Sequence, residues 1–399
     1  MPDWVWGLYE ALPHQTRVRG RVFRHFLLTV LRQIPVSILR GVTAERGLPC
    51  SIAIAGTRPW VEYLPDLFFQ APPEPEPLGS VPWWTLSRTL DRLALSANLV
   101  IARVDRISSH LLLDSRYLLV PEWVEVRLDV TQDLEATWSR SSSVQRDLQR
   151  IRKNDLSHEL SYSDADFRLW YSRYYVPFLR KRHTKYGVIA SMGRLRPHFR
   201  RGALLWVIHR GQRIAGMLMR QQGEVLHGLT LGTKDGEYSA LRLGAIAAIY
   251  YHAFHYAKTH GCHQVRFGGT RPIVTDGDVR YKRKWGLRLV ERADTYQFAV
   301  RCERLDEAVL GLLTQTPLTY REQGYLSAVA AVDSEGPATQ DKAAQAHRSL
   351  WTSGLHRLYL LSATGWEPGV HPPQDARLID LAGSNGEEFP QLLTSGSLA

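Results

Sequence analysis

Cysteine is scarce in this sequence: Cys50, Cys262 and Cys302 are the three among 399 residues. An odd number of widely spaced cysteines argues against a disulfide-stapled fold and favours a reducing compartment. No C-x-x-C pair occurs, and the nearest candidate group, His260 and His263 beside Cys262, lacks the spacing of a metal site. The sequence therefore predicts no metal centre.

Long apolar runs are also missing. No stretch reaches the ~18 consecutive apolar residues that a membrane-spanning helix needs. The N-terminal segment has no small-residue cleavage site of the secretory type. We therefore expect a cytoplasmic protein without a membrane span.

Acidic residues are the minority charge. The chain has 39 Asp and Glu against 50 Lys and Arg, which gives a net charge of +11 and a pI near 9.6. This excess favours an anionic partner, such as nucleic acid, acidic lipid, a nucleotide cofactor or an acidic glycan, although a solvated arginine-rich surface fits equally well. The hydrophobic fraction of 44% indicates a globular core, and the length predicts more than one domain.

Residues 14–34 form a predicted amphipathic helix that is rich in arginine. Val22, Phe26 and Val30 fall on one stripe at helical spacing, and Pro35 ends the helix. Such a helix usually docks on the core of its own protein, but the same pattern suits the surface of an anionic membrane. Peripheral contact with the inner face of the membrane is therefore an alternative role for this segment.

Residues 41–130 predict a small mixed sheet with one or two helices. Strands are expected over 98–105, 116–120 and 123–130. The proline-rich segment 71–80, APPEPEPLGS, is predicted not to pair into a sheet, because proline has no backbone N–H to donate. No motif with an identifiable chemistry occurs in this region.

Two helices of different character are predicted next. Arginines decorate the helix over 143–153, either as a solvated face or to steer an anionic substrate. Aromatic residues stripe the helix over 164–183, where Trp170 belongs to the core or stacks on a sugar ring.

A meander of strands follows these helices. Glycine-containing turns separate strands over 204–209, 213–220 and 224–231, a pattern typical of antiparallel hairpins. A helix over 243–260 and a strand over 264–267 complete the region.

The stretch 265–290, VRFGGTRPIVTDGDVRYKRKWGLRLV, carries the most specific pattern. Gly268 and Gly269 permit a sharp reversal or a close approach by another group, and Asp276-Gly277 is a strong turn signal. The stretch resembles the G-G-x-R-P-x-x-x-D-G-x-x-x-Y-K-x-x-W-G signature of the FemAB-like acyltransferases, a branch of the GNAT superfamily. With the elements before it, the resemblance covers roughly residues 138–300.

The resemblance implies an α/β (α+β) fold with tandem GNAT-like domains, each a mixed, mostly antiparallel sheet flanked by helices. It divides the chain into an N-terminal helix at 1–40, a degenerate GNAT-like domain at 41–130, a catalytic domain at 131–304 and a partly disordered extension at 305–399. We expect loop or disorder from about Glu367, where Gly, Pro, Ser and acidic residues dominate.

The implied activity is transfer of an acyl group from acetyl-CoA or another acyl-CoA to an amino sugar, peptide or cell-envelope precursor. GNAT enzymes hold the pyrophosphate on an R/Q-x-x-G-x-G/A loop before a helix, and Arg242, Gly244 and Ala245 match part of it. We therefore expect Arg242, Leu243, Gly244 and Ala245, with Leu231 on the preceding strand, to bind the donor.

Candidates for catalysis and for substrate binding come mostly from the signature stretch. The catalytic candidates are Asp276 as base, His227 as an alternative base, Tyr281 as proton donor to the leaving thiolate, and Lys282 as a fixed cation. The substrate-binding candidates are Arg271, Trp285, Gly269 and Trp170.

Three alternatives stay open at this point. Some FemAB-like proteins use aminoacyl-tRNA as donor, so tRNA is an alternative to acyl-CoA. A catalytically silent scaffold that keeps the GNAT shape is another. A nucleic-acid binder would rest on the basic charge alone.

Overall fold

Two units of structure share the chain. Unit 1 comprises Met1–Val124, Arg271–Arg280 and Leu289–Ala399, and unit 2 comprises Glu125–Thr270 and Tyr281–Arg288. The structure is a computed structural model that describes residues 13–56, 64–183, 189–292, 295–382 and 393. The predicted ranges 1–40, 41–130, 131–304 and 305–399 run consecutively, whereas these units interleave segments of the chain.

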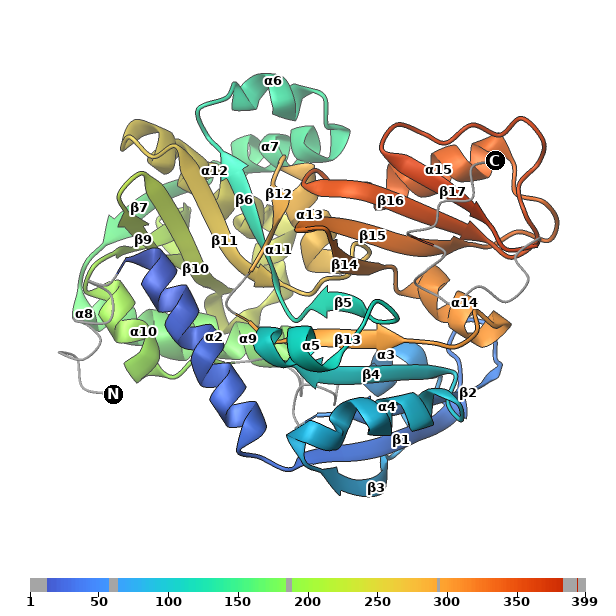
Figure 1. The fold of residues 1–399 in the computed structure, drawn as a ribbon. Coiled ribbons are helices and arrows are strands. Elements are labelled where there is room, and N and C mark those ends of the chain that lie inside the picture. The colour runs from blue at the N-terminus through green and yellow to red at the C-terminus, as the bar shows by residue number, and fades with distance from the viewer. Residues whose placement is uncertain (1–12, 57–63, 184–188, 293–294, 383–392, 394–399) are drawn as a thin grey trace. The chain divides into compact units, whose positions relative to one another are not determined.

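Unit 2 is built on a sheet in which its strands have the order β6-β11-β10-β9-β8-β7 (Figure 1). The strands are β6 (Val124–Asp129), β7 (Ser157–Ser161), β8 (Ala203–His209), β9 (Gln212–Gln222), β10 (Val225–Thr233) and β11 (Gln264–Thr270). Strand β12 (Arg288–Glu291) begins at the last residue of unit 2. Strands β7 to β10 pair antiparallel in succession, and β10 pairs with β11 in parallel. The predicted meander and the strand that follows the long helix are thereby confirmed.

Helices flank this sheet. They are α6 (Leu134–Ser139), α7 (Ser142–Lys153), α8 (Asp164–Trp170), the π-helical turn η2 (Tyr171–Tyr175), α9 (Val176–His183), α10 (Met192–Phe199), the 3-10 turn η4 (Lys234–Gly236), α11 (Tyr238–Leu243) and α12 (Ala245–Thr259). Helix α12 is the predicted 243–260 helix, and its buried side packs on β8, β9 and β10. Because α12 lies between β10 and β11 in the chain, it supplies the crossover that a parallel strand pair requires.

The first sheet of unit 1 has the order β3-β1-β2-β4-β13-β5. Its strands are β1 (Ile34–Val42), β2 (Pro49–Ala55), β3 (Glu76–Val81), β4 (Leu99–Val104), β5 (Leu118–Pro121) and β13 (Gln297–Arg301). Its helical elements are α2 (His14–Val30), α3 (Leu64–Phe68), η1 (Trp83–Thr85), α4 (Leu86–Ala94), α5 (Arg106–Leu112) and α14 (Glu307–Gln315). Both this sheet and that of unit 2 are mixed and mostly antiparallel, which confirms the predicted fold class.

The expectation that the proline-rich segment 71–80 stays out of a sheet was wrong. Residues Glu76–Val81 form β3 and pair antiparallel with β1, with Pro77 opposite Ser37. Strand β3 is the edge of its sheet. An edge strand tolerates proline because the missing N–H faces away from the ladder.

The expectation for the C-terminal stretch was also partly wrong. A second sheet of unit 1 has the order β14-β15-β16-β17. Its strands are β14 (Leu318–Glu322), β15 (Tyr325–Val332), β16 (Leu355–Ser362) and β17 (Ala376–Asp380), with α15 (Gln340–Leu350) between β15 and β16 in the chain. Strand β17 lies within the stretch predicted to be loop or disorder, and residues 383–392 and 394–399 of that stretch lie outside the described residues.

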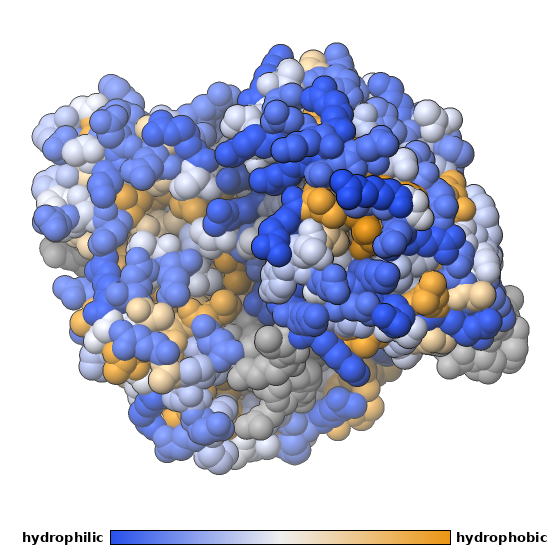
Figure 2. Space-filling view, turned by 180° about the vertical axis from the view of Figure 1, so that it is seen from behind, coloured by the Kyte–Doolittle hydropathy of each residue, from blue (hydrophilic) through white to orange (hydrophobic). Residues whose placement is uncertain are grey.

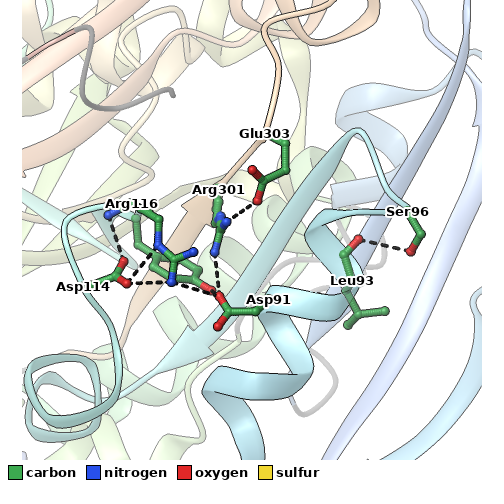
Figure 3. A network of polar contacts seen from close by, with 8 residues as sticks. Asp91, Leu93, Ser96, Asp114, Arg116, Arg301 and Glu303 are labelled. Atoms are coloured by element: carbon green, nitrogen blue, oxygen red, sulfur yellow. Dashed lines mark hydrogen bonds and ion pairs between the residues drawn. The ribbon is translucent and has the colours of Figure 1, made fainter. Parts of the chain in front are cut away.

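A buried arginine connects elements of unit 1 that are distant in sequence. Arg301 on β13 lies between Asp91 on α4, at 2.6 Å, and Glu303 (Figure 3). Arg116 in turn contacts Asp91 at 3.3 Å and Asp114 at 2.7 Å. A buried guanidinium with two carboxylate partners holds β13 against α4, and this is a structural role.

The exposed face in Figure 2 is mostly hydrophilic, with hydrophobic side chains in scattered patches. Within the described residues, no helix combines the length and the apolar character that crossing a bilayer requires. The same residues hold no cluster of three or more His, Cys, Asp or Glu side chains suited to a metal ion.

Candidate functional site

The parallel pairing of β10 and β11 ends early. It runs from Val225–Gln264 to Gly228–Phe267, although β10 continues to Thr233 and β11 to Thr270. Beside this end, the register between β10 and β9 shifts between Gly228 and Thr230. A bulge of this kind bends a strand and redirects its backbone groups. Beyond Gly228 and Phe267, the backbone groups of β10 and β11 therefore no longer pair with each other.

Lys282 reaches the point where the ladder ends. Its Nζ donates a hydrogen bond of 3.0 Å to the carbonyl oxygen of Phe267, and its residue is 6% exposed. Lys282 lies on α13 (Gly277–Lys284), a helix that begins at the predicted turn Asp276-Gly277. The structure therefore fixes one buried cation at the end of the paired stretch.

An aromatic cluster supports this helix. Its members are Trp138, Tyr250, Phe254, Phe267, Tyr281 and Trp285. The Tyr250 ring lies 4.3 Å from Phe267 and 5.3 Å from Tyr281, measured between ring centroids. Close aromatic packing holds the second half of α13 against β11 and α12.

Tyr281 keeps its proton at neutral pH. Burial, and then the nearby carboxylate of Asp147, raise the pKa of the Tyr281 phenol above its ordinary value. A neutral phenol can donate a proton but cannot act as a base near neutral pH. The same burial makes the phenol a weaker acid, and the role of Tyr281 as proton donor stays a prediction.

Helix α12 begins at a tight reversal. Gly244, its N-cap, has φ of 97°, a left-handed conformation that favours glycine. A Cβ at this position would lie 3.2 Å from the Cβ of Arg150. The first N–H groups of a helix have no partner within it and carry the positive end of its dipole. Gly244 thus lets the start of α12 lie directly against α7, beside Arg150.

Asn154 holds the basic end of α7 at this reversal. Its Nδ2 donates to the carbonyl oxygens of Leu243, at 2.9 Å, and of Arg150, at 3.0 Å. The last turn of α7 carries Arg150, Arg152 and Lys153. These cations belong to the predicted basic helix, and the structure places Arg150 next to the predicted donor-binding residues Gly244 and Leu243.

Asp147 orders the cations around it. This buried carboxylate forms ion pairs with Lys284 and, at 3.3 Å, with Arg150. Sequence reasoning did not select Asp147, because its partner Lys284 lies 137 residues away and no local pattern reports such a contact. The i,i+3 spacing of Asp147 and Arg150 was the one signal available.

His227 lies among cations on a strand of the same sheet. It is paired in register with Arg220 on β9 and Arg266 on β11. Burial, followed by the charges of Arg266 and Arg220, lowers the pKa of His227 to about 4. At neutral pH the imidazole is therefore uncharged and can accept a proton, although as a weak base.

The carboxylate of Asp276 serves as a helix cap. Its Oδ1 accepts a hydrogen bond of 2.8 Å from the backbone N–H of Asp278, at the start of α13. Asp276 and Arg271 belong to unit 1, whereas Tyr281, Lys282 and Trp285 belong to unit 2. As catalytic base and as substrate contact, Asp276 and Arg271 stay predictions.

The remaining predicted site residues differ in accessibility. Trp170 and Trp285 are fully buried. The Trp170 indole N–H donates to the Gly216 carbonyl oxygen at 3.1 Å, so no ring face is open to a sugar and we do not carry Trp170 further. Gly269 and Leu231 are half-buried on β11 and β10, beyond the paired stretch, and Arg242 on α11 is exposed.

No protein-family model matches the chain, and no curated protein matches it. Similar solved structures include one described as L-PGS from Bacillus licheniformis, at 10% identity and a TM-score of 0.35, covering 76% of this chain and 96% of that one. FemX matches at 12% identity and a TM-score of 0.36, covering 63% and 81%. A GCN5-related N-acetyltransferase from Sphaerobacter thermophilus matches at 12% identity and a TM-score of 0.30, covering 63% and 71%.

The likeness to these solved structures is one of fold alone. Their identities and TM-scores are too low to carry an argument about what this chain does. The case for a function therefore rests on the residues of unit 2.

Proposed function

We propose that the chain is an acyltransferase that moves an acyl group from an acyl-CoA thioester to an amine or hydroxyl of an amino sugar, peptide or cell-envelope precursor. The observation that supports it most is the early end of the β10–β11 ladder at Gly228–Phe267, with the buried cation of Lys282 at that point. A gap between two strands offers backbone N–H groups to an oxyanion, which is what acyl transfer needs in its transition state.

Each part of the reaction has a candidate group in this proposal. The acceptor nucleophile attacks the thioester carbonyl, whose oxygen gains negative charge beside the β10 backbone beyond Gly228. The carbon–sulfur bond then breaks, and the protonated phenol of Tyr281 supplies a proton to the thiolate. His227, uncharged at neutral pH, is the candidate that takes the proton from the acceptor.

Acyl-CoA is favoured as donor because the start of α12 suits a pyrophosphate group. Gly244 lets the start of α12 lie against α7, and Arg150 and Arg242 add positive charge there. The same cations would also bind the phosphates of an aminoacyl-tRNA, which is the second candidate donor. Strongly salt-dependent binding of tRNA, without binding of CoA, would favour that donor.

Substituting Gly244 tests the donor site. We expect Gly244→Ala to weaken acetyl-CoA binding at least 10-fold, because the added Cβ meets the Cβ of Arg150 and pushes this arginine away from the helix start. Isothermal titration calorimetry with acetyl-CoA measures the change. Transfer to a panel of amine acceptors, read by mass spectrometry, tests the activity itself.

Gly211→Ala is the matched control. Gly211 also has a positive φ, of 71°, but a Cβ there meets nothing within 4 Å. Both variants therefore carry the backbone strain of alanine in a left-handed conformation, about 1 kcal/mol. If the two variants lose binding equally, the start of α12 is not the donor site. If the wild-type protein transfers no acyl group to any acceptor, the chain is a catalytically silent scaffold.

We also propose that α2 contacts an anionic membrane. Phe26 faces inward onto Trp83, with ring centroids 5.8 Å apart, but Phe23 and Leu31 are 56% and 79% exposed. Together with Leu27 these exposed side chains recur every four residues, which places them on one helix face. Exposed arginines at 19, 24 and 32 accompany them. A basic helix with an uncovered apolar stripe suits the surface of an anionic bilayer.

Replacing Phe23 and Leu31 with serine should weaken sedimentation with phosphatidylglycerol vesicles by at least about 100-fold, since each side chain contributes roughly 1.5–3 kcal/mol when it leaves water. Leu95→Ser is the control, because Leu95 is 82% exposed in unit 1 but lies outside α2. Vesicle binding that does not change in the double variant, or is equal on neutral vesicles, would contradict membrane contact.

A further inference from the structure

Basic side chains form a row across one face of the sheet of unit 2. Arg220 on β9 and Arg266 on β11 flank His227 on β10, and each is paired with it in register. Neighbouring strands lie about 4.7–4.9 Å apart, so side chains in register on one face are close neighbours. Strand β6 lies beside β11 and adds Arg127, whose charge acts on Arg266. We call Arg127, Arg220, His227 and Arg266 the basic row.

The basic row lies on the face of the sheet that points away from α12. Phe267 on β11 packs against Tyr250 of α12, with 4.3 Å between ring centroids. Successive side chains of a strand point to opposite faces, so Arg266 points away from this helix. Buried and half-buried residues alternate along β6, and Arg127 is one of the half-buried ones. The side chains of Arg127 and Arg266 are 24% and 22% exposed, so solvent reaches both.

Arg127 and Arg266 share one carboxylate. The Oε1 of Glu125 lies 3.5 Å from the Nε of Arg266, and its Oε2 accepts a hydrogen bond of 3.4 Å from Arg127. Both distances exceed the roughly 2.7–2.9 Å of a strong guanidinium–carboxylate hydrogen bond. The Nε of Arg127 is buried and has no hydrogen-bond partner among the residues that the structure describes. The two guanidinium groups therefore keep donors that a loosely held carboxylate does not use.

The charges that act on His227 are positive. Burial lowers its pKa most, and the next causes are the charges of Arg266, Arg220, His198 on α10, and Arg127. Burial, and to a smaller extent the charge of Arg127, also lower the pKa of the Arg266 guanidinium. Like charges on neighbouring strands repel each other. A bound anion would remove this repulsion.

We propose that the basic row binds the phosphate of a phosphomonoester, and that this phosphate belongs to the acceptor. A phosphomonoester has three terminal oxygens that accept hydrogen bonds. Guanidinium groups on neighbouring strands can therefore bind it at once, each through a planar fork of donors. A carboxylate or a phosphodiester offers two such oxygens. The assignment to the acceptor rests on the proposed acyl transfer, in which His227 is the candidate base, but the binding of phosphate does not.

A phosphate in the basic row would also make His227 a stronger base. Negative charge near an imidazole favours its protonated form and raises its pKa. The weak base of the free protein is thereby strengthened when a phosphate-bearing acceptor is bound. The acceptor nitrogen or oxygen then forms a bond to the thioester carbonyl carbon and gives its proton to His227, while the carbon–sulfur bond breaks and CoA leaves.

Isothermal titration calorimetry of the full chain with O-phosphoethanolamine tests the site. We expect saturable binding that sodium chloride weakens, and no binding of ethanolamine, which lacks the phosphate. Arg266→Gln should weaken binding at least 10-fold, because it removes one fork of donors. Arg168→Gln is the matched control and should stay within twofold of wild type, because Arg168 is exposed on α8 in the same unit.

A variant that gains affinity keeps the test decisive if Arg266→Gln folds poorly. Glu125→Gln keeps the size of the side chain but removes the carboxylate that competes with phosphate for Arg127 and Arg266. It should tighten binding at least threefold, whereas loss of a merely structural ion pair would weaken binding or leave it unchanged. Weaker or unchanged binding in Glu125→Gln, equal losses in Arg266→Gln and Arg168→Gln, or failure of wild type to bind O-phosphoethanolamine would overturn the proposal.

An NMR titration locates the bound phosphate. Saturating O-phosphoethanolamine should raise the pKa of the His227 ring by at least about one pH unit, since the added charge lies beside it. An unchanged titration of His227 would place the phosphate elsewhere and overturn the proposal.

Steady-state transfer from acetyl-CoA distinguishes a soluble phosphomonoester from a lipid head group. We expect a KM for O-phosphoethanolamine at least 10-fold below that for dihexanoyl phosphatidylethanolamine, whose phosphate is a diester. The reverse order would assign the row to a lipid head group and overturn the monoester.

The failure of this inference and that of the proposed function are separable. Binding of O-phosphoethanolamine without transfer to any acceptor would retain the basic row as a phosphate site and refute the acyltransferase. Equal transfer to O-phosphoethanolamine and to ethanolamine would retain the acyltransferase and refute the assignment of the phosphate to its acceptor.

Discussion

Replacing Lys282 with methionine should abolish acyl transfer and lower the free energy of unfolding by about 2 kcal/mol. The Phe267 carbonyl oxygen accepts from Lys282 in a buried environment. Removing the donor leaves this acceptor with one partner fewer, and an unsatisfied buried group costs about 1–3 kcal/mol. The same change removes positive charge from the gap where the oxyanion would form. Urea denaturation and steady-state transfer measure the two effects.

Lys258→Met is the control for this prediction, because Lys258 is exposed on α12 in the same unit. It should change the free energy of unfolding by less than about 0.5 kcal/mol, as surface substitutions generally do. Lys282→Arg keeps the charge and should recover part of the stability. A Lys282→Met protein that is destabilised but retains full kcat would show that the ammonium is structural and not catalytic.

Local patterns sufficed for the part of unit 2 that holds the candidate site. Strands β8, β9 and β10 are separated by glycines with positive φ at 211 and 223, so hairpins follow from short-range signals. Helix α12 and strand β11 were likewise predicted from patterns of residues close together in the chain. The glycine at 244 was found through the resemblance to the GNAT phosphate loop, which Arg242, Gly244 and Ala245 match in part.

Pairings between distant segments could not be found in this way. Strand β13 lies between β4 and β5, and no periodicity in residues 297–301 reports which strands it joins. The ion pair of Asp147 with Lys284 is hidden for the same reason. Trp170 shows the complementary limit, because an aromatic residue on a helix looks the same in sequence whether it lines a pocket or fills a core.

Unit 1 contains an apolar cavity that also carried no sequence signal. Ile101, Val300 and Val309 read as ordinary core residues, and a void arises from how their elements meet. The signature stretch was predicted to wall the reaction site. The structure assigns Pro272 and Ile273 to the cavity wall, and Lys282 to the end of the β10–β11 ladder.

Acid should destabilise unit 2 before most carboxylates titrate, because two of its histidines resist protonation in the folded state. Burial is the main cause that lowers the pKa of both His227 and His252 to about 4. His252 is nearly enclosed, and its Nε2 lies 3.0 Å from the Leu156 carbonyl oxygen. Both groups keep their ordinary pKa of about 6.5 in the unfolded chain.

The sign of the effect follows from where the protons bind. Above pH 6.5 neither state is protonated and stability is unaffected by these groups. As the pH falls from 6.5 towards 4, these two histidines bind protons in the unfolded chain but not in the folded chain. The free energy of unfolding therefore decreases. Between pH 7 and pH 5 each histidine should cost about 2 kcal/mol, and below pH 4 neither adds a further loss.

Urea denaturation at pH 7.0, 6.0 and 5.0 measures this loss. In His252→Gln, the free energy of unfolding should fall by about 2 kcal/mol less between pH 7 and pH 5 than in wild type. This comparison holds even if the substitution changes the stability at pH 7. His263→Gln is the control, because His263 is an exposed histidine in the same unit. An identical pH dependence in wild type and His252→Gln would mean that His252 is charged in the folded protein, and that α12 packs less tightly against Leu156 than described here.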